Sequence, residues 1–297
     1  MQEYIDSVTE IAPWFFPLFS FGIGACIGSF LNVCIYRIPE GLSIIHPPSR
    51  CGACGTPIPF YRNIPIFAWV VLRGKAACCG APFSVRYPAI EFLTGILFLA
   101  SWMLLPAAPA MVGMVWIAIL IPVTFIDLDH MIIPDRFSIG GLFIGLALSS
   151  IVPEIHGIET VNPLVGGIQG FFTAMIGALI GSAVILWIMI LAEIVLKKEA
   201  LGFGDVKLMG AIGAFCGWQG AIFALFGGAV LGTIAIIIVQ LVNLLRPKKD
   251  DSEEGGGMIG REIPFGPMLA GGSLLYYLYL APQVDQYFAQ FSGILTP

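Results

Sequence analysis

Charged side chains are scarce in this sequence. Asp, Glu, Lys and Arg together account for 11% of its 297 residues, whereas soluble domains carry about 25%. Hydrophobic residues reach 58%, and the mean hydropathy is +0.91. This composition excludes an ordinary soluble enzyme, and a net charge of −5 argues against a nucleic-acid partner.

Other features are absent as well. The first ten residues, MQEYIDSVTE, lack the basic start of a secretory signal, so the first apolar run is expected to stay as an anchor. The apolar runs are long rather than short and alternating, which excludes a β-barrel. The sequence has no evident internal repeat, and it has no unit of strand, glycine-rich loop and helix for a nucleotide cofactor.

Eight apolar segments predict an all-α polytopic membrane protein, because several of them reach the length that crosses a bilayer. A polar loop of residues 37–88 separates the first two segments, and the short sixth segment is rich in glycine. The expected segments are about 13–36, 89–105, 109–126, 136–152, 167–195, 205–218, 220–245 and 264–283.

All 14 Lys and Arg residues fall on one side of this arrangement. They lie in or at the edges of the connections that follow the first, third, fifth and seventh segments. By the positive-inside rule this side is cytoplasmic, and both termini are expected on the opposite side. The agreement supports the number of segments, because a missed helix would scatter the cations over both faces.

Acidic residues gather at the cytoplasmic ends of two segments. FIDLDHMIIPD follows the third segment and contains Asp127, Asp129 and Asp135, and GFGD places Asp205 at the start of the sixth. Both groups are expected at a similar depth, so they can meet in the bundle. A carboxylate at membrane depth costs about 3 kcal/mol or more, which calls for a reason to keep it there.

Two facing carboxylates suit acid–base chemistry on a peptide bond. Like charges a few ångströms apart cannot both ionise cheaply, so one of them keeps a proton. The ionised partner then takes a proton from water, and the protonated one polarises the carbonyl. Gly202 and Gly204 would let an extended substrate backbone approach Asp205. The alternative is that the acids only cap helices or tether loops, which fits Asp129 and Asp135 as well.

Four of the seven cysteines lie in the polar loop. Cys51 and Cys54 have the two-residue gap of a zinc knuckle, and Cys78 and Cys79 follow after 23 intervening residues. Four thiolates in a reducing compartment favour a structural zinc site over disulfides. Zinc would hold together a loop too small for a strong core. The cysteines expected to serve as packing residues are Cys26, Cys34 and Cys216.

Five motifs occur in order along the chain: GSFLNVCIYRIP, HPPSRCGACG, GAPFSVRYPAIE, FIDLDHMIIPD and GFGDVKL. Together they resemble the bacterial type IV prepilin peptidases, which belong to the Gly-x-Gly-Asp intramembrane aspartic proteases. The resemblance spans about residues 20 to 270, and five ordered motifs make it specific.

The resemblance implies a bifunctional enzyme of the bacterial inner membrane with periplasmic termini. Such an enzyme removes the short basic leader of prepilins or pseudopilins, in type IV pili or type II secretion, after a glycine and on the cytoplasmic side. It then N-methylates the newly exposed residue, usually phenylalanine, with S-adenosylmethionine.

The family pattern also implies residue roles. The catalytic pair falls on Asp127 and Asp205, because Asp127 holds the leading position of the first acidic motif. The chain would divide into an N-terminal region, 1–105, linked to methyl transfer, and a six-span peptidase bundle, 106–297. The supporting residues would be Gly202, Gly204, Asp129, Asp135 and Lys207.

The second cysteine pair departs from the family pattern, which has GKCxxCG where this sequence has GKAACCG. Ala76 stands at the expected first cysteine, Cys79 matches, and Cys78 is displaced by two residues. Three outcomes are open: Cys78 is the fourth metal ligand, another group is, or the metal is absent. Some family members lack these cysteines, so cleavage need not depend on them.

The methyl-transfer site is weakly marked in the sequence. The resemblance points to the N-terminal half and its loop. Asn32 and Glu91, near the cytoplasmic ends of the first two segments, are candidates, although hydrogen bonding at the interface explains them as well. The amine to be methylated has a pKa near roughly 8, so its deprotonation needs only modest assistance.

Three rival functions stay open at this point. A proton-coupled transporter would also use paired acids in the membrane, yet transporters often contain repeats and hold their acids near the midplane. The second rival is a zinc-loop scaffold without catalysis. The third is a peptidase without methyl transfer.

Overall fold

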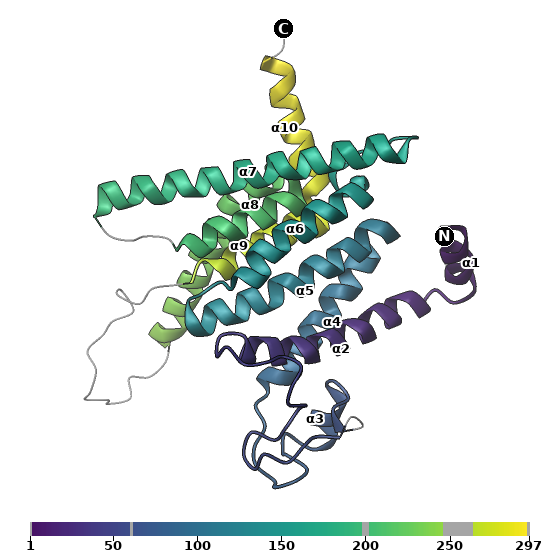
Figure 1. Ribbon diagram of the computed structural model, residues 1–297, viewed down its shortest axis with the longest axis vertical. Helices are drawn as coiled ribbons and strands as arrows, with labels where there is room; N and C mark the ends of the chain where they lie inside the picture. The colour runs from purple at the N-terminus through teal and green to yellow at the C-terminus, as the bar shows by residue number, and fades with distance from the viewer. Residues whose placement is uncertain (1, 60–61, 198–201, 246–263, 296–297) are drawn as a thin grey trace.

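The computed structural model describes residues 2–59, 62–197, 202–245 and 264–295, and these are largely helical outside the loop that follows the first long helix (Figure 1). The described residues form no strand beyond two isolated bridges. The elements are α1 (Gln2–Ile11), α2 (Phe15–Arg37), α3 (Phe67–Val71), α4 (Arg86–Leu104), α5 (Ala107–His130), α6 (Asp135–Ile151), η2 (Pro153–His156), α7 (Pro163–Leu196), α8 (Phe203–Leu245), α9 (Gly266–Leu275), η4 (Tyr276–Leu280) and α10 (Ala281–Leu295).

The all-α membrane fold is confirmed. Within the described residues, α2, α4, α5, α7 and α8 are long and apolar enough to cross a membrane. The helix α8 contains a break at Gly217, whose φ of 67° and ψ of −179° lie outside the helical region. This break falls at the end of the expected sixth segment, 205–218, and α6 and α9 match the expected fourth and eighth. The total of eight spans stays a prediction.

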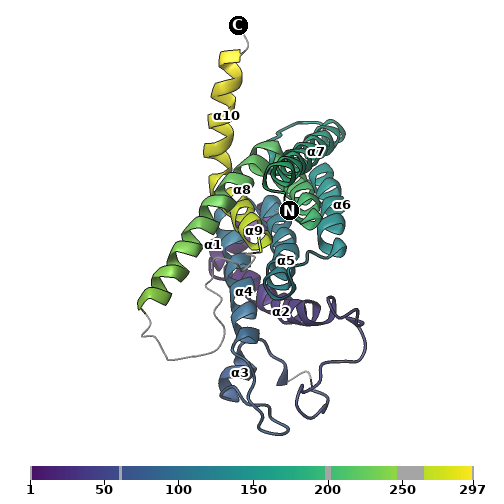
Figure 2. The same cartoon turned by 90° about the vertical axis from the view of Figure 1, so that its left-hand side faces the viewer.

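Three helices were not expected from the apolar pattern. The short helix α1 precedes the first apolar segment, and α3 lies within the polar loop of residues 37–88. The helix α10 continues well beyond residue 283, the expected end of the last segment. Figures 1 and 2 show α10 and the loop that holds α3 projecting at opposite ends of the molecule. Hydropathy does not detect these helices, because α1 and α10 carry polar residues that lower the average and α3 has only five residues.

Close helix contacts depend on small residues. In Figure 1, α7 runs along α8, and Gly177 of α7 meets the backbone of Gly213 in α8 so closely that a Cβ on either residue would collide with the other helix. The pair α2 and α4 also packs closely. In lipid, such helices associate through close van der Waals packing rather than through the hydrophobic effect.

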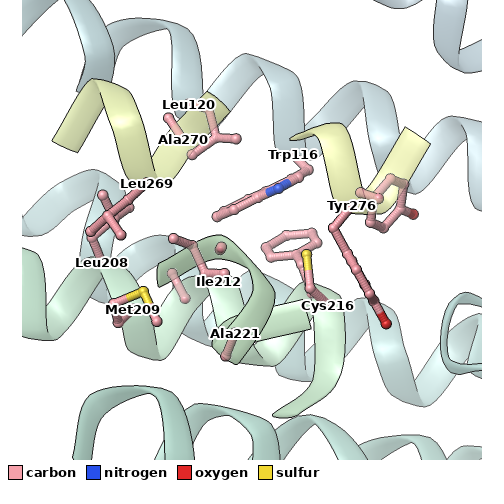
Figure 3. Close-up of a cluster of buried hydrophobic side chains, with 14 of the residues drawn as sticks. Trp116, Leu120, Leu208, Met209, Ile212, Cys216, Ala221, Leu269, Ala270 and Tyr276 are labelled. Carbon is pink, nitrogen blue, oxygen red and sulfur yellow. The ribbon is translucent and has the colours of Figure 1, made fainter. Parts of the chain in front are cut away.

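A buried cluster joins α5, α8 and α9 (Figure 3). Its centre is Trp116 of α5, whose ring stacks on Phe215 of α8 with centroids 4.4 Å apart. Leu269 and Ala270 of α9 also belong to the cluster, and so does Cys216. Cys34 and Cys216 are buried, as expected for packing residues, whereas Cys26 is exposed. This core therefore fixes the three helices whose ends carry the acidic site described next.

Candidate active site and cysteine cluster

Asp127 lies in the last turn of α5 and is 5% exposed. The helix ends at Met131, which adopts a left-handed conformation and donates its N–H to the Asp127 carbonyl. The side-chain oxygen Oδ2 of Asp127 accepts a hydrogen bond of 3.0 Å from the backbone N–H of Gly266, the first residue of α9. A helix N-terminus offers such unpaired N–H groups and favours a negative charge, so α9 holds this carboxylate in place.

Asp205 lies in the first turn of α8 and is 7% exposed. Its Oδ2 accepts a hydrogen bond of 3.2 Å from the N–H of Gly202, and its own N–H donates to the Gly202 carbonyl. The carboxylate is also close enough to Asp127 for a direct electrostatic interaction. The structure therefore brings together the two acids that the sequence selected.

Ile133 packs between the two acidic ends. A Cβ built on Gly204 would lie 3.1 Å from the Ile133 Cβ, and one built on Gly266 would lie 3.2 Å from its Cδ1. The same Cβ on Gly266 would approach Asp127 Oδ2 to 2.6 Å. Gly204 therefore has a packing reason to lack a side chain, whereas the position of Gly202 leaves room for an approaching chain.

The remaining acids of the first motif form ion pairs. Asp129 accepts two hydrogen bonds from Arg86 of α4, at 3.0 and 2.6 Å, and Arg86 also lies over the ring of Phe125. Asp135, at the start of α6, accepts from Lys207 of α8 at 2.6 Å. Both pairs connect helices next to the catalytic candidates, which suits the supporting role expected for Asp129, Asp135 and Lys207.

Sequence reasoning missed Gly266, Ile133 and Arg86. Gly266 belongs to the stretch PFGP at the start of the last apolar segment, and a glycine beside two prolines there was the available signal. Its partner Asp127 is 139 positions away in the chain, so the pattern could not identify the contact. Arg86 was counted only as a cytoplasmic cation, although it lies within a family-like motif.

The four loop cysteines gather in one cluster, with all four sulfur atoms within 4.8 Å of one another. Cys51 and Cys79 are 3.7 Å apart, Cys54 and Cys78 are 3.3 Å apart, and Cys78 and Cys79 are 3.9 Å apart. The displaced Cys78 is therefore part of the cluster, which favours the first of the three outcomes left open above.

Two turns of the same design build this cluster. Cys51 donates its N–H to Thr56 and accepts from Gly55, while Ala76 donates to Ala81 and accepts from Gly80. Gly55 and Gly80 both have φ of 71°, and an isolated bridge flanks each turn. Ala76 thus occupies the place of a knuckle cysteine, and Cys78 supplies its sulfur from a position equivalent to Ala53. This short repeat escaped the sequence analysis.

The cluster fits a tetrahedral metal ion. Zinc–sulfur bonds of about 2.3 Å place the sulfur atoms of a tetrahedron about 3.8 Å apart, close to the observed spacings. A hydrogen bond with the Thr56 hydroxyl lowers the pKa of the Cys54 thiol to about 6, while the Cys54 sulfur raises the pKa of Cys78 to about 12. Two such neighbours lose both protons readily only when a cation lies between them.

Asn32 and Glu91 lie together beneath the cysteine loop, on a cavity of about 590 Å³. Asn32 of α2 donates its side-chain N–H to the Tyr87 carbonyl at 3.1 Å, and Glu91 of α4 accepts the N–H of Ile66 at 2.7 Å. Both side chains are buried. Their hydrogen bonds tie α2, α4 and the loop together, and they also face a volume large enough for a small molecule.

Comparison with known protein families divides the chain into two matched regions. Residues 23–105 match the bacterial peptidase A24 N-terminal domain, and residues 114–237 match the type IV leader peptidase family. The first region contains most of α2, the cysteine loop and α4, and the second contains both catalytic candidates. No solved structure gives a significant match.

Curated relatives carry one common name, prepilin leader peptidase/N-methyltransferase. The relative from Myxococcus xanthus is 38% identical over 75% of this chain and 64% of its own length. The relative from Klebsiella pneumoniae is 34% identical over 74% of this chain and 94% of its own length. The relative from Pectobacterium carotovorum is 31% identical over 91% of this chain and 96% of its own length. The chain therefore belongs to the prepilin leader peptidase/N-methyltransferase family.

Proposed function

We propose that Asp127 and Asp205 are the acid–base pair with which this chain cleaves the leader peptide of prepilins or pseudopilins. The observation that carries the proposal is a pair of buried carboxylates at the ends of α5 and α8, each held by a glycine N–H and close enough for the charge of Asp127 to act on Asp205. The names of the relatives, which combine leader peptidase and N-methyltransferase, supply the substrate class and the second activity.

The proposed cleavage uses one proton shared by the pair. The ionised carboxylate takes a proton from a water molecule, which attacks the peptide carbonyl, and the protonated carboxylate donates to the carbonyl oxygen. The tetrahedral intermediate then collapses, and the leaving amine takes a proton from the pair. Breaking the amide requires an extended backbone, and the exposed Gly202 offers room for it beside Asp205.

The active site is proposed to face the cytoplasm of the bacterial inner membrane, with both termini in the periplasm. The distribution of Lys and Arg supports this orientation. Both acidic ends lie where α5 stops and α8 starts, next to cationic residues such as Arg86 and Lys207. A substrate whose basic leader stays in the cytoplasm would reach this end of the bundle.

The N-terminal region, 1–105, is proposed to carry the methyl transfer, and region 106–297 the cleavage. S-adenosylmethionine is the proposed donor, since it supplies an electrophilic methyl group to an amine. Zinc held by Cys51, Cys54, Cys78 and Cys79 would fix the loop between α2 and α4, without a part in the cleavage itself.

The two functions are tested on the purified full-length chain in lipid. A prepilin with a basic leader is the substrate, cleavage is followed by mass spectrometry, and a labelled methyl donor reports methylation. Asp127→Asn and Asp205→Asn should each reduce cleavage at least 1000-fold while methylation of an already cleaved pilin continues. Normal cleavage by either variant would show that the pair is misassigned.

A proton-coupled transporter is the main rival, and the same samples distinguish it. The paired acids lie at helix ends rather than at the middle of a span, which favours the peptidase. If proteoliposomes moved protons with a solute while prepilin stayed intact, the transporter would replace the peptidase.

A further inference from the structure

Two adjoining cavities lie between the cysteine loop and the ends of α2 and α4. The larger, of about 590 Å³, and the smaller, of about 140 Å³, share part of their walls. The residues common to both are Cys51, Ile58, Asn63, Ala76, Phe83, Tyr87 and Glu91. The larger cavity is within the range of about 300–1,000 Å³ typical of small-molecule sites.

The larger cavity contains groups of both charges. Glu91 is 9% exposed, and its Oε2 accepts the Ile66 N–H at 2.7 Å. Arg37 lines the same cavity and donates to the carbonyls of Ser43 and Pro47, at 2.9 and 2.8 Å, which holds its guanidinium in position. A ligand there would need a cationic part for Glu91 and an anionic part for Arg37.

The smaller cavity has an aromatic wall, and Arg62, Lys75 and Glu91 also line it. The rings of Phe83 and Tyr87 stack with centroids 4.6 Å apart. The indole N–H of Trp69 donates to the Phe83 carbonyl at 3.0 Å, and Trp69 and Leu72 also line the cavity. Aromatic surfaces of this kind accept the flat face of a heterocycle and attract cations.

We propose that this double cavity binds the methyl donor S-adenosylmethionine, an inference that rests on the proposed methyl-transfer function. The donor combines a purine ring, a positive sulfonium, an ammonium group and a carboxylate. The purine fits the aromatic cavity, the cationic groups face Glu91, and the carboxylate faces Arg37.

Contacts at its wall connect this cavity to the cleavage site. The backbone carbonyl of Tyr87 accepts a hydrogen bond from the Asn32 side chain. The preceding residue, Arg86, forms an ion pair with Asp129 of α5. Asp129 is two residues from the catalytic candidate Asp127. These contacts link the wall of the cavity to the end of α5 that carries Asp127.

The transfer at this site balances without another reactant. The ammonium of the new N-terminus first loses a proton to water. The amine lone pair then forms the nitrogen–carbon bond while the carbon–sulfur bond breaks, and the breaking pair stays on sulfur. The products are a methylated, positively charged amine and a neutral thioether. Glu91 would hold the cationic donor and would not enter the bonds that change.

Donor binding tests the proposal separately from catalysis. S-adenosylhomocysteine and sinefungin, which cannot transfer a methyl group, are titrated into the purified full-length protein by calorimetry. Glu91→Gln keeps the hydrogen-bond acceptor for Ile66 but removes the charge, and it should weaken sinefungin binding at least 10-fold. The matched control is Glu193→Gln, an exposed position on α7, which should bind as the unchanged protein does.

Leader cleavage is measured on the same samples, and it should be unchanged in Glu91→Gln. Equal sinefungin affinity in Glu91→Gln and the unchanged protein would overturn the proposal. Absence of donor binding in the unchanged protein, with cleavage intact, would overturn both this site and the methyl-transfer function, but not the peptidase.

Photo-crosslinking of methyl-labelled S-adenosylmethionine gives a second test that needs no variant. We expect label in peptides that contain Tyr87 or Asn32, and we expect added S-adenosylhomocysteine to prevent this labelling. Competed label confined to α6, α7 or α8 would contradict the assigned site.

Discussion

At the scale of single residues, backbone amides orient the two carboxylates. Gly266 donates to Asp127, and Gly202 donates to Asp205. Hydrogen bonds from neutral amides fix the geometry of a carboxylate without placing a second full charge beside it. The acids can therefore share a proton in a fixed arrangement, as catalysis on a peptide bond requires.

Gly266→Ala should impair cleavage more than stability. The added Cβ would lie 2.6 Å from Asp127 Oδ2 and 3.2 Å from Ile133, so the carboxylate must move. Because small displacements at a reacting centre are costly, we expect at least a 10-fold loss of the cleavage rate. The measurement is the rate of leader release beside the melting temperature in detergent.

Gly271→Ala is the matched control for that substitution, in the same helix. Its Cβ would meet only the flexible end of Leu231, at 3.3 Å. The account is contradicted if Gly266→Ala cleaves like Gly271→Ala while both variants fold.

At the scale of elements, paired charges and paired turns hold the helix ends around the site. Arg86 connects α4 to α5, and Lys207 connects α8 to α6. Both pairs are partly exposed, and such pairs contribute only about 0–1 kcal/mol to stability. We therefore expect these two ion pairs to matter for the position of Asp127 and Asp205 more than for the free energy of unfolding.

An exchange of charges tests the pair of Lys207 and Asp135. Lys207→Asp alone places two acids together and should lower cleavage about 10-fold or more, with little loss of thermal stability. Adding Asp135→Lys should restore most of the rate. A double variant as inactive as the single one would mean that Lys207 acts in some way other than through Asp135.

The two loop turns predict that a cysteine at position 76 can replace Cys78 as the fourth metal ligand. Cys78→Ala should lower bound zinc from about one ion per chain, measured by plasma mass spectrometry, and should loosen the loop. Adding Ala76→Cys should restore zinc, because Ala76 has the backbone hydrogen bonds of a knuckle cysteine. Full zinc binding by Cys78→Ala would show that Cys78 is not a ligand.

The apolar runs and their breaks were sufficient to predict the bundle at the level of elements. Hydropathy found the long helices, and the expected boundary between the sixth and seventh segments, after residue 218, lies next to the observed break at Gly217. Polar helices such as α1 and α10 were missed, because their membership in the fold depends on contacts rather than on composition.

The acids of the site could be selected from sequence, but their partners could not. The resemblance to the family selected Asp127 and Asp205. The contact with Gly266 spans 139 positions, and the role of Cys78 became visible only from the hydrogen bonds around Ala76. Tertiary contacts of this kind leave no local pattern. The cavity around Glu91 is likewise formed when α2, the cysteine loop and α4 fold together.

At the scale of the whole molecule, the far end of the bundle has its own polar network. His156 in η2 hydrogen-bonds Ser149 of α6 at 3.0 Å, and Ser149 donates to the Ala214 carbonyl of α8 at 3.0 Å. The break at Gly217 lies beside the same imidazole. This network joins α6, η2 and α8 at the end opposite the acidic site.

Stability should fall on mild acidification through His156. Burial lowers the pKa of His156 from an ordinary 6.5 to about 4, so the fold favours the neutral ring. Above about pH 6.5 the His156 ring is neutral in both the folded and the unfolded chain, so protonation of this residue does not lower the stability. Between about pH 6.5 and 4 only the unfolded chain gains a proton, and at most about 3 kcal/mol is lost.

Melting temperature measured from pH 7.5 to 4.5 tests this expectation. His156→Gln should weaken the dependence on pH in that range, whereas His130→Gln at the exposed end of α5 should retain it. An unchanged pH dependence in His156→Gln would assign the effect to other groups.

The central claim, that the carboxylates of Asp127 and Asp205 act as one unit, is tested most directly by comparing single and double substitutions. Cleavage rates are measured for Asp127→Asn, Asp205→Asn and the double variant, all folded by their melting temperatures. Residues that act as a unit are strongly non-additive, so each single variant should lose as much activity as the double one. Losses that multiply in the double variant, or a single variant that keeps its activity, would contradict the account.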